Sequence, residues 1–138
     1  MSEQNKAALQ HWTDEGFNKQ NLDEFDVYFS PGLVNHALPP GLPAGLEGTK
    51  MLASVFLAAY PDLQITLEDV VAEGDKVVAR WSAQGTHQGD LMGIPPTGKE
   101  VTITGIVIDR FENGRSVERW ENIDQLGMMQ QLGVIPAG

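Results

Sequence analysis

The spacing of hydrophobic residues in this chain changes at Pro61. Before Pro61, apolar side chains recur every three or four residues, as on one face of a helix; after it they alternate, as on a strand. Helices are therefore expected first and strands second. This separation predicts an α+β fold. We expect N-terminal helices packed on a strongly curved, mainly antiparallel sheet, forming a cone with an internal cavity.

Three helices are expected before Pro61. They cover residues 9–17, 22–29 and 49–60. The second ends at Pro31 and Gly32, and the third ends before Pro61, because proline cannot continue a helix. Thr49 is a suitable N-cap for the third helix, since its hydroxyl can accept a hydrogen bond from a free backbone amide of the first turn.

A short strand and four long strands complete the expected fold. The short strand covers residues 33–37, and the long ones cover residues 63–72, 77–87, 101–111 and 117–124. The sequences Glu73-Gly74-Asp75 and Asn113-Gly114 predict tight hairpin turns. The long strands are therefore expected to pair antiparallel.

The composition describes one globular domain, which we expect to span residues 1–138. The net charge of −10 argues against binding to nucleic acid or to anionic membranes, because both attract clustered basic residues. The absence of cysteine excludes disulfides and thiolate chemistry. The N-terminus lacks an apolar signal segment, and no apolar run approaches the roughly 18 residues needed to cross a bilayer. We therefore expect a cytoplasmic protein.

The last strand ends at its most informative residue, Asp124. Alternation places Glu118, Trp120, Asn122 and Asp124 on one face, which we expect to be the inward face. A carboxylate beside an indole has its charged form destabilised, which raises its pKa and suits it to proton transfer. The alternative is structural: Asp124 can be the N-cap of the following helix and accept a hydrogen bond from an amide two or three residues later.

Two histidines stand at strand ends, where they could join Asp124. His36 ends the short strand, and His87 ends a long one. If these ends converge, the three side chains can act together, and a metal site with two histidines and one carboxylate is an alternative. We expect no metal, because no ligands lie at short spacing along the chain.

Other familiar reaction types lack their motifs. Gly93 to Lys99 has the spacing of a phosphate-binding loop, but Glu100 stands where Ser or Thr should hold magnesium, and two prolines remove amide donors. There is no G-x-S-x-G turn and no dinucleotide-binding fingerprint. Acid–base chemistry in a cavity, without a cofactor, is the reaction type that remains.

Five short motifs are spread over residues 5–133. They are Tyr60-Pro61-Asp62, Gly85-Thr86-His87-Gln88-Gly89, Gly93-Ile94-Pro95-Pro96-Thr97-Gly98-Lys99, Glu118-x-Trp120-x-x-x-Asp124-x-x-Gly127 and Gln131-Leu132-Gly133. With these motifs the chain resembles the SnoaL-like polyketide cyclase family, which belongs to the nuclear-transport-factor-2-like superfamily of α+β cones. The resemblance implies a fold rather than one reaction.

The resemblance to the cyclases implies an intramolecular aldol ring closure on a hydrophobic, carbonyl-bearing small molecule, without a cofactor. Asp124 would remove a proton from the carbon next to a carbonyl. His36 and His87 would face the same cavity and, with Asn122, stabilise the enolate. The residues expected to bind the substrate are Trp12, Phe17, Tyr28, Phe56, Trp81, Trp120 and Asn122.

Two alternatives stay open on the same cone. One is a dehydratase or isomerase, because His36, His87 and Tyr28 resemble the set used by scytalone-dehydratase-like enzymes. Ketosteroid-isomerase-like enzymes keep their base carboxylate near the first strand, but residues 27–46 here contain no Asp or Glu, so that site is disfavoured. Limonene-epoxide-hydrolase-like enzymes pair the late Asp with an Arg-x-Asp motif on a neighbouring strand, and this chain has no such motif. The other is a non-catalytic protein that binds hydrophobic ligands.

We also expect a homodimer or higher homo-oligomer, paired through the outer face of the sheet.

Overall fold

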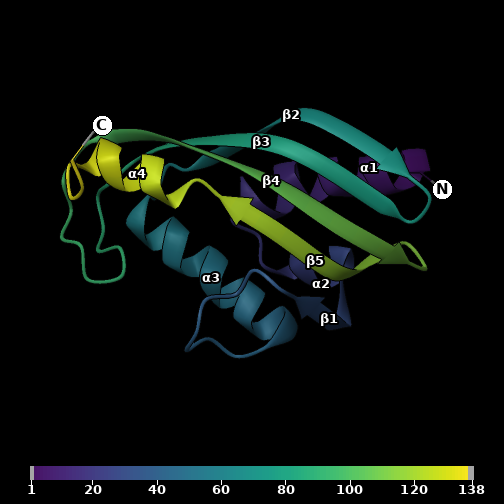
Figure 1. Ribbon diagram of the computed structural model, residues 1–138. Coiled ribbons are helices and arrows are strands. Elements are labelled where there is room, and N and C mark those ends of the chain that lie inside the picture. Colours follow the sequence, from purple (N-terminus) through teal and green to yellow (C-terminus); the bar gives the residue numbers. More distant parts are fainter. Residues whose placement is uncertain (1, 137–138) are drawn as a thin grey trace.

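The computed structural model describes residues 2–136, with helices first and a sheet second (Figure 1). The helices are α1 (Ser2–His11), the π-helix η1 (Trp12–Phe17), α2 (Asp23–Tyr28), α3 (Gly45–Ala59) and α4 (Gln125–Leu132). The strands are β1 (Phe29–Asn35), β2 (Gln64–Glu73), β3 (Lys76–Thr86), β4 (Glu100–Glu112) and β5 (Arg115–Ile123). Among the helices of residues 2–136, none is both long and apolar enough to cross a membrane.

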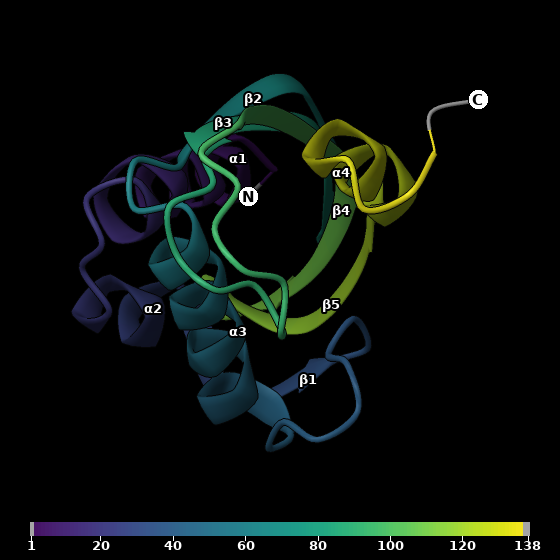
Figure 2. The same ribbon diagram turned by 90° about the vertical axis from the view of Figure 1, so that its left-hand side faces the viewer.

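All five strands belong to one sheet, in the order β1-β5-β4-β3-β2. β2, β3, β4 and β5 pair antiparallel with their neighbours, and β1 runs parallel to β5. The sheet curls without closing, and α1, α2 and α3 lie along its open side (Figure 2). The expected α+β cone with a mainly antiparallel sheet is confirmed.

The N-terminal elements have different ends from those expected. α2 stops at Tyr28, because the backbone is already extended at Phe29. Pro31 therefore lies inside β1, which tolerates it as an edge strand with irregular pairing. α3 begins at Gly45, so Thr49 is one turn inside the helix and is not its N-cap. The Thr49 hydroxyl instead donates to the Gly45 carbonyl (2.9 Å).

The inner face of the sheet is built from alternate residues of the long strands. They are Val77, Ala79, Trp81 and Ala83 on β3, and Val101, Ile103, Val107 and Phe111 on β4. The alternation expected for β3 is confirmed. These side chains form one hydrophobic core with buried residues of the helices. The core therefore occupies the inside of the curl.

β5 contains a bulge that changes which of its residues face inward. Ser116 pairs with Phe111 of β4, and Glu118 pairs with the residue before Phe111, so Val117 has no partner. Ser116 is buried, and the next buried residue is Arg119 rather than Glu118. A one-residue bulge shifts the alternation by one position. Odd-numbered residues of β5 therefore face inward from Arg119 onwards.

Candidate functional site

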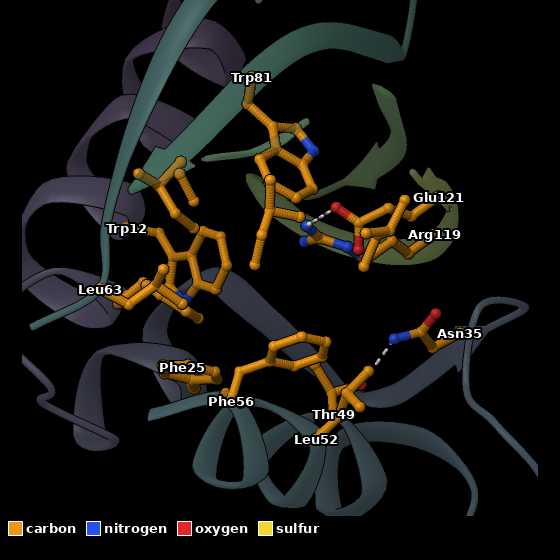
Figure 3. Close-up of a pocket in the computed structure, with 16 residues that line it drawn as sticks. Trp12, Phe25, Asn35, Thr49, Leu52, Phe56, Leu63, Trp81, Arg119 and Glu121 are labelled. Atoms are coloured by element: carbon orange, nitrogen blue, oxygen red, sulfur yellow. Dashed lines mark hydrogen bonds and ion pairs between the residues drawn. The ribbon is translucent and has the colours of Figure 1, made fainter. Parts of the chain in front are cut away.

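A cavity of about 90 Å³ lies between the inner face of the sheet and the helices (Figure 3). Most of its wall is apolar and includes Trp12, Phe17, Phe56 and Trp81. The polar residues of the wall are Asn35, Thr49, Arg119 and Glu121, which lie together on one side (Figure 3). A bound molecule would therefore meet aromatic surface on one side and charged groups on the other.

Arg119 lies between two acidic side chains. Its Nη1 is 3.3 Å from Oδ2 of Asp109, and its Nη2 is 3.6 Å from Oε2 of Glu121. The guanidinium also lies over the rings of Trp12 (5.1 Å) and Phe29 (5.3 Å), an arrangement that attracts a cation. Arg119 is only 6% exposed and Asp109 is fully buried. Buried charges of this kind need partners, and here they have each other.

Tyr28 lies behind the cavity wall rather than on it. Its hydroxyl donates a hydrogen bond to Oδ2 of Asp109 (2.5 Å), the same oxygen that faces Arg119. Burial raises the pKa of Asp109, while Arg119 and the Tyr28 hydroxyl act against this rise. The structure therefore places Tyr28 in the network that supports Arg119. Its expected role in substrate binding stays a prediction.

Glu121 is the carboxyl group that reaches the cavity from this network. Burial raises the pKa of Glu121; the Arg119 guanidinium opposes this rise, and the Asp109 carboxylate adds to it. The indole nitrogen of Trp81 lies on the Glu121 side of the cavity (Figure 3), and its N–H opposes the rise in the Glu121 pKa, although within residues 2–136 it has no partner with ordinary hydrogen-bond geometry. A carboxyl with a raised pKa, next to a cation and apolar surface, can accept and return a proton.

Asp124 lies outside this cavity, and its expected inward placement is wrong. Trp120, Asn122 and Asp124 do share one face, but it is the outer face, where they line a second hollow of about 840 Å³. The bulge in β5 is the reason. The Asp124 carboxylate accepts a hydrogen bond from the amide of Gly127 (2.9 Å) and is the N-cap of α4. The alternative interpretation as a helix cap is confirmed.

His36 also lies on the outer side. Its ring stacks on that of Trp120, with centroids 5.2 Å apart and planes at 15°. Its Nε2 is 2.7 Å from Oε2 of Glu118. The hydrogen bond with His36 lowers the pKa of Glu118, and Arg110 acts in the same direction. His36 is therefore not among the residues that line the cavity of Figure 3.

His87 is fully buried beneath the connection between β3 and β4. Its Nδ1 accepts a hydrogen bond from the amide of Thr97 (3.2 Å), and its carbonyl accepts one from the amide of Gly98 (2.8 Å). Its ring lies against Tyr60, and it does not line the cavity. His36, His87 and Asp124 thus do not converge. Within residues 2–136, no three potential ligands are grouped to hold a metal ion.

The sequence matches the SnoaL-like polyketide cyclase family over residues 7–132. The chain belongs to this family. It is 29% identical to nogalonic acid methyl ester cyclase of Streptomyces nogalater over 120 residues, which cover 85% of this chain and 89% of that one.

Solved structures of the SnoaL-like fold agree with this assignment. AclR of Streptomyces galilaeus, a proposed hydroxylase, superposes with a TM-score of 0.88 at 28% identity, covering all of this chain and 86% of that one. IdmH of Streptomyces antibioticus, a proposed polyketide cyclase, has a TM-score of 0.82 at 33% identity, covering 94% and 98%. Relatives with different assigned chemistry share the fold, so the site must decide the reaction.

The sequence interpretation of this SnoaL-like chain missed Asp109, Arg119 and Glu121. One signal was available: Asp109 occupies an inward position of β4 among apolar neighbours. A carboxylate on the apolar face of a strand requires a buried partner. Asp109 of β4 pairs with Arg119 of β5, so both side chains face inward. Knowledge of this pairing would have predicted Arg119 on the inner face. That pairing depends on the bulge at Val117, which no local pattern marks.

Proposed function

We propose that this protein is a polyketide-cyclase-like enzyme in which Glu121 is the acid–base residue of an intramolecular aldol ring closure. The observation that carries the proposal is the position of Glu121, a carboxyl with a raised pKa and only 14% side-chain exposure on the wall of an apolar cavity. The family supports cyclase chemistry, and the relative from Streptomyces nogalater is nogalonic acid methyl ester cyclase.

The proposed reaction needs one proton carrier and one group that stabilises negative charge. The Glu121 carboxylate takes a proton from the carbon next to a carbonyl, and the electron pair of the C–H bond forms an enolate. Arg119 stabilises the enolate oxygen. The enolate carbon attacks a second carbonyl of the same molecule, forming the ring bond. The resulting alkoxide takes the proton back from Glu121, so the carboxylate is regenerated.

The proposed substrate is a hydrophobic molecule with at least two carbonyl groups. The aromatic wall favours an apolar body, while Arg119 and Glu121 lie where the reacting carbonyl would be held. The cavity volume of about 90 Å³ is below the roughly 300 Å³ of a typical small-molecule site. We therefore propose that the reacting end enters the cavity and that the rest of a larger substrate extends through its opening.

Exchange of α-hydrogens for deuterium tests the proton transfer directly. Nogalonic acid methyl ester and small aryl ketones are incubated with the protein in D₂O, and deuterium uptake is followed by mass spectrometry. Glu121→Gln should slow uptake by about 10²- to 10⁴-fold, the usual worth of general acid–base catalysis. Asp124→Asn, which tests the role predicted from sequence, should exchange at the wild-type rate.

The opposite pattern would overturn the assignment to Glu121. Loss of exchange in Asp124→Asn but not in Glu121→Gln would place the reaction in the outer hollow. Tight binding of the ketones with no exchange in the wild type would favour the alternative of a non-catalytic hydrophobic-ligand-binding protein. Water elimination from a hydroxyketone without ring closure would favour the dehydratase alternative.

We also propose that the protein forms a homodimer through the outer face of the sheet. Ile106 of β4 is 51% exposed there and lines the outer hollow with Trp120. A wide hollow on a sheet face, with exposed apolar side chains such as Ile106 among polar ones, is suited to a protein partner. Ile106→Glu should shift the sedimentation coefficient from that of a dimer to that of a monomer. A wild-type protein that is monomeric at micromolar concentration contradicts the proposal.

A further inference from the structure

The buried network contains two acids for one base. Asp109 and Glu121 carry two negative charges when ionised, and Arg119 carries one positive charge. Asp109 is the closer partner, at 3.3 Å against 3.6 Å for Glu121. Arg119 can therefore neutralise only one of the two negative charges, and it lies closer to Asp109.

Tyr28 adds to the difference between the surroundings of the Asp109 and Glu121 carboxylates. Its hydroxyl donates to Oδ2 of Asp109, so this one oxygen receives both the tyrosine hydrogen bond and the Arg119 contact. Charge-assisted hydrogen bonds of this kind are stronger than neutral ones. Glu121 is held less closely: Arg119 lies 3.6 Å away, and the Trp81 indole N–H, which opposes the rise in the Glu121 pKa, meets no acceptor within residues 2–136 with ordinary hydrogen-bond geometry. The closer donors of the network thus face Asp109.

The titratable groups that face one another here come from three elements. Tyr28 comes from α2, Asp109 from β4, and Arg119 and Glu121 from β5. Burial raises the pKa of Tyr28, and the Asp109 carboxylate raises it further, so the tyrosine hydroxyl keeps its proton and remains a donor. The cluster therefore has a fixed donor at one end and a carboxyl that reaches the cavity at the other.

We infer that Tyr28 and Asp109 are positioning residues for the reaction, which hold Arg119 so that its charge is only partly available to Glu121 and leave Glu121 able to keep and release a proton. The inference rests on the proposed role of Glu121. Neither Tyr28 nor Asp109 lines the cavity, so each acts through Arg119.

Removing the Asp109 charge should release Arg119 to Glu121. In Asp109→Asn, the nearby negative charge is gone and the guanidinium has one carboxylate left. Both changes stabilise the ionised form of Glu121, so its pKa should fall. Tyr28→Phe should act in the same direction but less strongly, because Asp109 loses its donor and holds its charge less well.

The experiment is a carbon-13 NMR titration of the Glu121 carboxyl in the full-length chain, assigned with Glu121→Gln. It needs no substrate. Asp109→Asn should lower the proton affinity of Glu121 by about tenfold or more, as expected when a like charge is removed nearby. Tyr28→Phe should lower it by about threefold. In the exchange assay, the acidic limb of the pH–rate profile should move to lower pH in both variants.

Tyr60→Phe is the matched control. Tyr60 is fully buried, but its hydroxyl has no hydrogen-bond partner among the residues that the structure describes, and its ring lies against His87, outside this network. It should leave the titration of Glu121 unchanged. If Tyr28→Phe and Asp109→Asn also leave it unchanged, or raise the pKa, the inference is wrong. If the Asp109→Asn variant does not fold, the titration of Glu121 in the Tyr28→Phe variant still tests the inference.

The same titration separates this inference from the proposed function. A Glu121 pKa in the ordinary range in the wild type would contradict the role of Glu121 itself. A raised pKa that does not respond to Tyr28→Phe or Asp109→Asn would contradict only the positioning role. A purely structural role of the two residues would reduce stability without moving the titration midpoint of Glu121.

Discussion

Glu121 and Asp124 are three residues apart in the chain, yet their carboxylates lie on opposite faces of the sheet. Glu121 lines the inner cavity beside Arg119 and also borders the outer hollow, whereas Asp124 lines only the outer hollow and caps α4. The two acids therefore have different surroundings. One has its charged form destabilised by burial, and the other is held by a backbone amide at a helix end.

Glu121→Gln should raise the thermal stability at neutral pH. Burial raises the folded-state pKa of Glu121 above its unfolded value, so the wild type loses stability as pH rises from about 4.3, the ordinary glutamate value, through the folded pKa. Glutamine does not ionise and avoids this loss. Thermal unfolding at pH 7 should show a gain on the order of 1 kcal/mol, which disappears at pH 4.

Glu118→Gln is a suitable comparison, because folding lowers the pKa of Glu118 whereas it raises that of Glu121. His36 lowers the folded-state pKa of Glu118, so the ionised form contributes stability above the unfolded pKa, and this contribution is lost as pH falls through the folded pKa. The variant should be less stable than the wild type at neutral pH, and equally stable in acid. Equal pH dependence in the two variants would contradict this account of Glu121.

Arg119→Met should destabilise the fold in a pH-dependent way. It leaves Asp109 and Glu121 buried without a counter-charge, which typically costs about 3–5 kcal/mol. The loss should be smaller at pH 5, because both carboxyls can then take up protons in the folded state. Urea unfolding at pH 7 and pH 5 measures the difference. An equal loss at both values would show that Arg119 acts through packing alone.

Gly105→Ala should displace Trp81 from the cavity wall. The two residues pair across β3 and β4, and a Cβ at position 105 would lie 2.4 Å from Cζ2 of the indole. Overpacking of this kind costs about 1–3 kcal/mol. The tryptophan emission should change, and ketone binding should weaken. Thr104→Ala, on the outer face of the same strand, should leave both unchanged.

His87→Ala should loosen the connection between β3 and β4. It removes the acceptor for the Thr97 amide and a fully buried ring, and we expect a loss of about 1–3 kcal/mol. Hydrogen exchange should rise in residues 88–99. Deuterium uptake by bound ketone should persist, since His87 is away from the cavity. Loss of uptake with unchanged loop protection would instead support the catalytic role predicted from sequence.

Asp124→Ala and Asp124→Asn should differ in stability. Alanine removes the cap of α4 and should cost about 0.5–2 kcal/mol, whereas asparagine can still accept the Gly127 amide and should cost little. Urea unfolding of the two variants measures this. Equal stability of alanine and aspartate at position 124 would mean that the cap contributes nothing.

Much of this fold could be predicted from local sequence patterns. The change of period at Pro61 separated helices from strands, and Asn113-Gly114 predicted the β4–β5 hairpin correctly. Four of the aromatic residues expected at the site, Trp12, Phe17, Phe56 and Trp81, lie on the cavity wall. Local patterns succeed here because apolar periodicity and turn chemistry depend on neighbouring residues alone.

The candidate site could not be predicted in the same way. Of the neighbours Arg119 and Trp120, the apolar Trp120 was expected to face the cavity. Instead, Arg119 faces the cavity and Trp120 lies on the outer face. Arg119 is stabilised there by Asp109 of β4 and by the ring of Trp12, residues that are distant in the chain. No single segment contains that information.

Helix and strand order, the hairpins and the family resemblance follow from the amino-acid sequence alone, because each depends on residues close together in the chain. The identity of the acid that enters the cavity depends on the register between β4 and β5. One unpaired residue, Val117, exchanges the two faces of β5, since side chains alternate with a period of two. Only the paired strands decide this, and they place Glu121 inside and Asp124 outside.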